Sequence, residues 1–419
     1  MRGFGAEVHH AKTKDGYYIH VVHIINPEID RSKLRRPVIF NHGLLESSTI
    51  WLINANKVKP LPYEHQCGEI SPSQLSANET QYLNGPMMLA NHGFDVWLMS
   101  MRGTDWSLKH ETLSAKDPEF WDYCLDDFAL VDVPTVIDYV LRKTGSKKVG
   151  YIGHSQATFS IFGLLATIPS YADIVEPVIA VAPVAFFDHI TSVARLLFLG
   201  TLTATNKDKH GPFPKEAKEL RTTLASVCKR PGSFLKTACD LVEMLISGKG
   251  DKWLLGYFAH LPFFTSLKVL RHFGQLIQSK RYQMYDYGAE ENKRIYGSTR
   301  SPSYNIKRIR SKSLCLISTK SDALSPPTDV SRFKNQLTVP LYKDIFIDKD
   351  FDHFDLITSA GAKELVFKPI MAIFEEFELN SANCVPQQQS SDYKEDFTNE
   401  IGLEYHKEKD QVENEATAN

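Results

Sequence analysis

One five-residue stretch limits what this chain can fold into more than any other: Gly153-His154-Ser155-Gln156-Ala157. It follows a strand-like run over 148–152 and precedes an apolar, helix-like run over 158–168. A serine between small residues, on a sharp turn from a strand into a helix, is typical of a nucleophile elbow. Small neighbours let the strand and the helix approach around the strained serine backbone. The second small residue is alanine where the pattern usually has glycine, and taken alone the stretch also fits an ordinary turn.

The rest of the chain alternates between apolar strand-like runs and helical patterns. Asp15-Gly16 is a hairpin signal between the strand-like runs 7–14 and 17–25. Continuous apolar strands that alternate with helices predict an α/β fold, with a mostly parallel central sheet flanked by helices on both faces. Further strands are expected at 37–40, 95–99, 178–183, 313–318 and 344–348. Helices are expected at 87–92, from Asp117-Pro118 to about 143 with a kink or a boundary at Pro134, and at 362–377.

Two candidate partners for the serine follow later strands. Asp322 comes just after the strand at 313–318, and His353 comes just after the strand at 344–348. Functional residues of open α/β sheets lie at the carboxyl ends of strands, and the chain order Ser, Asp, His is the order of an α/β-hydrolase triad. Asp329, Asp352 and Asp355 lie near the same strand ends and are rivals of Asp322. Asp322 is favoured because it alone follows directly on a buried strand.

A second catalytic element is expected near the amino terminus. The buried strand 37–40 runs into Asn41-His42-Gly43-Leu44-Leu45. In hydrolases of this type, a strand that ends in His-Gly supplies one half of an oxyanion hole, and the amide of Leu44 is placed to point at the developing oxyanion. A plain glycine turn is the alternative.

Residues 185–300 abandon the alternation and predict an inserted helical cap. This segment is rich in large apolar side chains, and a cap over a hydrolase sheet also forms the substrate pocket, so we expect an apolar substrate. A second hydrophobic core made of the same residues is the alternative. The apolar runs are 196–199, 253–255 and 261–264, the last of which contains Phe263 and Phe264.

Together these motifs resemble the acid lipase family of the α/β-hydrolase superfamily, which holds gastric lipase, lysosomal acid lipase and related steryl-ester hydrolases. The resemblance covers about residues 3–377. It is carried by the motifs Asp15-Gly16-Tyr17, Asn41 to Ser48, Asp95-Val96-Trp97-Leu98 with Arg102-Gly103, Gly153-His154-Ser155-Gln156, Tyr285-Asp286-Tyr287-Gly288, Asp322 with Asp329-Val330, and His353 with Asp355.

The resemblance implies a role for each site residue. Ser155 is the nucleophile, His353 the general base and Asp322 its orienting acid, while the amides of Leu44 and Gln156 form the oxyanion hole. The implied reaction is hydrolysis of a lipid ester, a triacylglycerol or a steryl ester, through an acyl-enzyme, with no metal or organic cofactor. An acyl transferase or thioesterase with the same triad, and an inactive lipid-binding member, remain alternatives.

The expected compartment depends on conflicting signals. By resemblance the protein is lysosomal or secreted, and Cys228 with Cys239 look like the family's cap disulfide. Asn78 stands in a glycosylation sequon, Asn78-Glu79-Thr80. The chain opens without the apolar core of a signal peptide, however, which predicts an intracellular protein if this amino terminus is complete.

Net charge and hydrophobicity exclude some classes of partner. A net charge of −2 over 419 residues argues against nucleic acid, and no apolar run reaches the ~18 residues of a membrane span. The oligomeric state is not predicted.

We expect a hydrolase core over 1–184 and 301–384, with a long surface loop at 57–84, the cap at 185–300, and a disordered acidic tail at 385–419.

Overall fold

The computed structural model describes residues 3–53, 60, 84–203, 210–215, 244, 247–248 and 264–381. Several predictions fall outside these residues: most of the surface loop at 57–84, most of the cap between 204 and 263, and the tail at 385–419. Asn78, Cys228, Cys239 and Phe263 also lie outside them. Within the described residues, no helix is long and apolar enough to cross a membrane.

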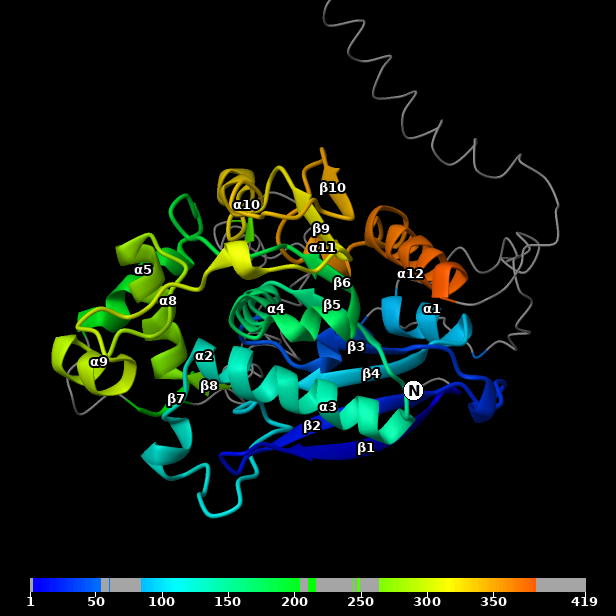
Figure 1. Cartoon of the computed structure of the whole chain (residues 1–419), viewed down its shortest axis with the longest axis horizontal. Helices are drawn as coiled ribbons and strands as arrows, with labels where there is room; N and C mark the ends of the chain where they lie inside the picture. Colours follow the sequence, from blue (N-terminus) through cyan, green and yellow to red (C-terminus); the bar gives the residue numbers. More distant parts are fainter. Residues whose placement is uncertain are drawn as a thin grey trace, which may run out of the picture.

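One eight-stranded sheet organises the described residues (Figure 1). Its strands lie in the order β1-β2-β4-β3-β5-β6-β9-β10, and every neighbouring pair from β4 to β10 is parallel. Only β2 runs against the others, because the hairpin at Asp15-Gly16 reverses the chain. The strands are β1 (Gly5–Lys12), β2 (Tyr18–Ile25), β3 (Pro37–Asn41), β4 (Asp95–Ser100), β5 (Val149–His154), β6 (Val175–Val181), β9 (Leu314–Thr319) and β10 (Lys343–Ile347).

Helices cover both faces of the sheet. One hydrophobic core joins the sheet to α3 (Val133–Thr144), α4 (Gln156–Thr167) and α10 (Pro327–Lys334). A second core joins the opposite face to α1 (Gly85–Asn91), α11 (Asp355–Thr358) and α12 (Lys368–Ser381). Buried strand residues alternate between the two cores, as Tyr151 and Ile152 do in β5. The predicted α/β-hydrolase architecture is therefore confirmed.

The helical region before β5 is more broken than expected. Pro118–Trp121 forms only a 3-10 turn, and Asp117 makes no side-chain cap to it, since its carboxylate accepts the backbone N–H of Ser114 instead. The chain then continues through α2 (Leu125–Asp127) and a π-helical turn at Phe128–Asp132 into α3. Pro134 lacks an N–H, and the wider turn directly before it accommodates the missing hydrogen bond.

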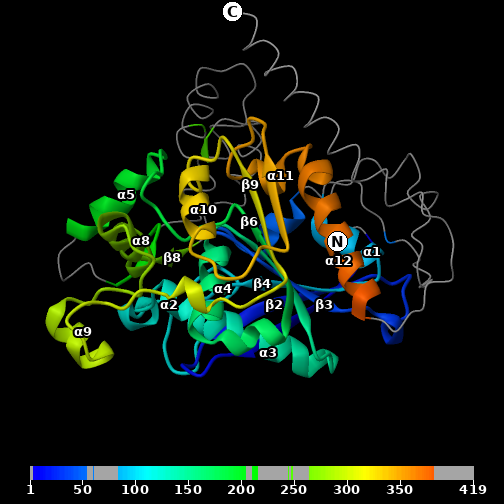
Figure 2. The ribbon, with the colours of Figure 1, turned by 45° about the horizontal axis from the view of Figure 1, so that its top comes forward.

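The described part of the predicted cap lies to one side of the sheet (Figure 1). It contributes α5 (Ala194–Gly200), α8 (Leu267–Ser279), α9 (Ala289–Tyr296) and a small antiparallel sheet of β7 (Pro212–Phe213) with β8 (Thr265–Ser266). Helices α5 and α8 pack side by side (Figure 2). The rings of Phe198, in α5, and Phe273, in α8, stack with their centroids 5.0 Å apart.

Candidate active site

Ser155 occupies a strained turn between β5 and α4. Its backbone has φ 54° and ψ −118°, outside the regions that L-residues prefer, so it turns the chain sharply and leaves the side chain half-buried. Gly153 is needed for this turn, because a Cβ atom there would lie 2.8 Å from Cε1 of Tyr151 and 3.2 Å from Cβ of Ala157. The elbow pattern usually has glycine at the position of Ala157. The methyl group of Ala157 is accommodated here, since it packs fully buried in the core.

Ser155, His353 and Asp322 form one hydrogen-bonded line. Nε2 of His353 lies 2.7 Å from Oγ of Ser155, and Nδ1 lies 2.7 Å and 2.9 Å from the two carboxylate oxygens of Asp322. Because a carboxylate only accepts, Nδ1 carries the proton, and Nε2 is left to accept from the serine hydroxyl. Both His353 and Asp322 are buried, so solvent does not compete for these contacts.

The Asp322 carboxylate is held by its own loop. Its Oδ1 accepts the backbone N–H groups of Leu324 at 2.8 Å and Ser325 at 2.7 Å. Burial opposes the charged form of His353, but the attraction of Asp322 outweighs burial and raises the pKa of the imidazole above its ordinary 6.5.

The three rival aspartates are engaged elsewhere. Asp329, in the first turn of α10, accepts from Nδ1 and from the backbone N–H of His189. Asp352 accepts the amides of Phe354 and Asp355, and Asp355 in turn accepts the amide of Asp352. Asp352 and Asp355 fold the loop around His353, and Asp329 joins α10 to His189.

The predicted oxyanion segment lies against the serine. A Cβ atom on Gly43 would lie 3.0 Å from Cβ of Ser155, so only glycine allows this approach without displacement. Leu44 follows and is partly buried against the core, and Leu45 turns the chain with φ 60°. Gln156 is the first residue of α4, where a backbone N–H has no acceptor within the helix. Both predicted amides thus belong to segments that flank Ser155.

Sequence reasoning missed a buried network around Glu46. One carboxylate oxygen of Glu46 accepts the amide of Gly43 at 2.5 Å and lies 3.3 Å from Nδ1 of His154. Nε2 of His154 donates to the backbone carbonyl of His353 at 3.0 Å. Burial opposes the charge of Glu46, but His154 and the amide outweigh it and lower the pKa of the carboxyl. The only sequence signal was an acid close behind the His-Gly pair.

The backbone at Ser247 was also missed. Its carbonyl accepts the N–H of Ala323 at 3.1 Å and that of His353 at 3.2 Å, and its hydroxyl donates to Asp352 at 2.8 Å. A residue of the predicted cap therefore ties the Asp322 loop to the His353 loop. No local pattern marks it, because the contact is made by a backbone carbonyl.

The described apolar residues of the cap divide into two groups. Phe198 and Phe264 pack into the core, Phe264 with its ring 6.1 Å from that of Trp121. Leu196 and Leu197 of α5 are exposed, Leu196 to 73%. Within the described part of the predicted cap, apolar surface is therefore exposed on α5, while Phe264 packs against the core.

Comparisons with known proteins find two matching family models and related lipases. Residues 1–55 match a model of a partial alpha/beta-hydrolase lipase region, and residues 36–205 match a model of the alpha/beta hydrolase fold. The chain is 31% identical over 391 residues to gastric triacylglycerol lipase of Bos taurus, covering 89% of both chains. It is 28% identical to lysosomal acid lipase/cholesteryl ester hydrolase of Macaca fascicularis, covering 90% of this chain and 89% of that one.

A solved structure supports the fold alone. An acetylester hydrolase from Corynebacterium glutamicum aligns with a TM-score of 0.51 at 11% identity, over 88% of this chain and 96% of that chain.

Proposed function

This chain belongs to the acid lipase family of α/β-hydrolases, and from that premise we propose that it cleaves carboxylic esters of lipids through an acyl-enzyme on Ser155. The observation that carries the proposal is the line of contacts at 2.7 Å from Ser155 through His353 to Asp322. It provides a nucleophile, a base and a group that orients the base.

The reaction follows from these contacts. As Oγ of Ser155 attacks the ester carbonyl, Nε2 of His353 takes its proton, and Asp322 stabilises the imidazolium. The amides of Leu44 and Gln156 donate to the oxyanion, each contributing about 3 kcal/mol to the transition state. The imidazolium then protonates the leaving alcohol. Water attacks the acyl-enzyme with His353 again as base, which releases the fatty acid and restores Ser155.

The proposed substrates are triacylglycerols or steryl esters. The names of the relatives include both. Helix α5 exposes leucines, and Ser192, just before this helix, donates its amide to the carbonyl of Ala323, next to Asp322. We assign residues 185–300 to a cap over the site. The family relationship also favours a lysosomal or secreted protein, with a Cys228–Cys239 disulfide and a glycan on Asn78, which peptide mapping under non-reducing conditions tests.

Labelling with a fluorophosphonate tests the nucleophile. Intact-mass measurement of the purified chain should show one adduct, located on Ser155 by peptide mapping and absent from Ser155→Ala. Absence of labelling in the folded wild type would favour an inactive lipid-binding protein. A panel of long-chain triacylglycerols, steryl esters and thioesters, each with water or an alcohol as acceptor, then separates a lipase from a thioesterase or an acyl transferase.

A further inference from the structure

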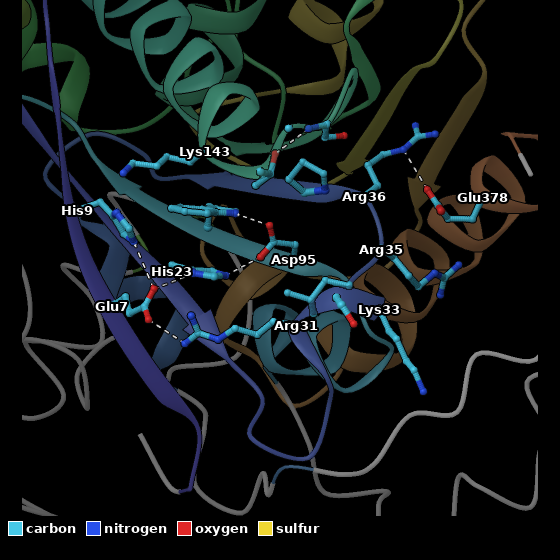
Figure 3. Close-up of a pocket in the computed structure, with 17 residues that line it drawn as sticks. Glu7, His9, His23, Arg31, Lys33, Arg35, Arg36, Asp95, Lys143 and Glu378 are labelled. Atoms are coloured by element: carbon cyan, nitrogen blue, oxygen red, sulfur yellow. Dashed lines mark hydrogen bonds and ion pairs between the residues drawn. The ribbon is translucent and has the colours of Figure 1, made fainter.

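Three metal-ligating side chains meet on one face of the β1–β2 hairpin. Residues two apart in a strand face the same way, so Glu7 and His9 share a face of β1. The register places His23 of β2 directly opposite Glu7. One ligand atom from each of the three lies within 4.8 Å of the other two. Figure 3 shows the three side chains converging from the two strands.

The distances fit a shared ion better than direct hydrogen bonds. Oε2 of Glu7 lies 3.7 Å from Nε2 of His9 and 3.5 Å from Nδ1 of His23. Both values exceed the usual range of N–H···O hydrogen bonds. With metal–ligand bonds of about 2.0–2.2 Å at tetrahedral angles, two ligand atoms of Zn²⁺ lie roughly 3.4 Å apart.

The outer nitrogens of both histidines are already held. Nε2 of His23 lies 2.5 Å from Oδ1 of Asp95, whose other oxygen accepts the indole N–H of Trp97 at 3.0 Å. Nδ1 of His9 lies 3.0 Å from the hydroxyl of Tyr139. A metal-bound histidine commonly has such a partner on its second nitrogen, which fixes the tautomer and the ring orientation.

The inner nitrogen of His9 lacks a hydrogen bond. Among the described residues, Nε2 of His9 is buried and has no hydrogen-bond partner, although it faces the Glu7 carboxylate. A buried nitrogen of this kind is costly unless something binds it. A cation between His9, His23 and Glu7 would bind the lone pair of this nitrogen.

Arg31 competes for the carboxylate without blocking it. Its Nη2 donates to Oε1 of Glu7 at 2.8 Å, which leaves Oε2 directed at the two histidines. The cluster borders a cavity of about 800 Å³ that Arg31 and Lys143 also line, so solvent reaches the remaining side of the cluster (Figure 3). The nearby cations reduce the affinity of the cluster for a metal, and their removal should increase it.

We propose that Glu7, His9 and His23 bind a divalent transition-metal ion, with Zn²⁺ the best match to two imidazole nitrogens and one carboxylate oxygen. Water from the cavity completes the coordination. The ion joins β1 to β2. Because His23 also contacts Asp95, the first residue of β4, the ion is linked to β4 as well. Ser155 lies at the other end of the sheet, beyond the carboxyl ends of the parallel strands, so this site stands apart from the ester-cleaving residues.

Zinc titration of the chelator-treated full chain by calorimetry tests the proposal. The wild type should bind one Zn²⁺ that His9→Gln and Glu7→Gln bind at least tenfold more weakly, with their folding checked by circular dichroism. The matched control is His10→Gln, because His10 is the next residue of β1, faces the other way and is exposed. It should bind zinc as the wild type does. Arg31→Gln should bind more tightly.

A second measurement identifies the ligands. Co²⁺ bound to the wild type should give the intense visible absorption of a tetrahedral site, and His9→Gln should lose it. Equal zinc affinity and stoichiometry in the wild type, His9→Gln and Glu7→Gln would overturn the proposal and leave the cluster as ion pairs alone. Ester hydrolysis should be the same with and without Zn²⁺, so failure here is distinct from failure of the lipase proposal.

Discussion

Nε2 of His154, the residue before the proposed nucleophile, donates to the backbone carbonyl of His353, the proposed base, at 3.0 Å. The other nitrogen of His154 faces Glu46, which also accepts the amide of Gly43. One buried path therefore joins the oxyanion segment, the elbow and the loop of the base. Such a path holds three parts of the site in fixed relative positions, and small displacements of reacting groups are costly to catalysis.

Glu46→Gln tests this path. The amide side chain keeps the shape of glutamate but loses the charge that faces His154, so we expect kcat to fall by about ten- to a hundredfold with little change in KM. The matched control is Glu375→Gln, which removes a carboxylate of α12 paired with Arg35 at 2.6 Å. That variant should lose melting temperature but keep kcat. Equal kcat in Glu46→Gln and the wild type would contradict the role of the path.

Asp322→Asn should nearly abolish ester hydrolysis. An amide at this position favours the wrong tautomer of His353, and the equivalent change elsewhere has cost about 10⁴ in turnover. Asp329→Asn is the control, because Asp329 contacts His189 instead. Steady-state kinetics and melting temperatures of both variants check the prediction. A loss below about tenfold in Asp322→Asn, equal to 1.4 kcal/mol, would remove Asp322 from the triad.

The elbow allows a double-mutant test. Gly153→Ala should lower both stability and turnover, since the new Cβ atom would crowd Tyr151 and Ala157. Ala157→Gly should keep turnover and cost about 1 kcal/mol of stability, because glycine is a poor helix residue. Combining the two should recover part of the Gly153→Ala loss, since the close contact with Cβ of Ala157 disappears. Strictly additive losses in denaturant unfolding would show that the two residues do not interact.

The loss of activity at low pH should follow the protonation of His353. The protonated imidazole cannot accept the serine proton, and Asp322 raises its pKa above 6.5 against the effect of burial. As pH falls through this raised pKa, kcat/KM should therefore fall, with a midpoint above pH 6.5. A pH–rate profile with a soluble short-chain ester measures this midpoint in the free enzyme. A midpoint below pH 6.5 would mean that Asp322 does not dominate the titration.

Leu196→Asp should impair hydrolysis of emulsified long-chain esters. Leu196 is 73% exposed on α5, and Ser192, just before this helix, donates its amide to the carbonyl of Ala323 beside Asp322. An exposed apolar surface on the helix that follows this contact suits contact with lipid. We expect roughly a tenfold loss on emulsions and little loss on soluble acetate esters. Val8→Asp, at an equally apolar exposed position on β1, is the control and should affect neither. Equal losses on both substrates would indicate a misfolded cap.

Much of the architecture was readable from local patterns. The hairpin at Asp15-Gly16, the strand before Ser155 and the helix after it depend on turn chemistry and on runs of apolar residues, which are properties of neighbouring residues. The regular part of the sheet is therefore where prediction and structure agree. The helical region before β5 is the exception. Its π-helical turn at Phe128–Asp132 accommodates Pro134, and such a turn leaves no periodic signal in the sequence.

The sequence by itself determined the elbow, the order of Ser155, Asp322 and His353 along the chain, and the alternation that brings strand ends to one edge of a parallel sheet. The sequence also favoured Asp322 among four aspartates near the strand ends. Only the tertiary structure placed its carboxylate against Nδ1 of His353, because that contact joins two loops 31 residues apart. It also decided the contacts of Glu46 with His154 and the opposition of Glu7 to His23. The first contact joins a loop to a strand end 108 residues away. The second depends on the register of the β1–β2 hairpin, and a one-residue shift would turn His23 to the other face.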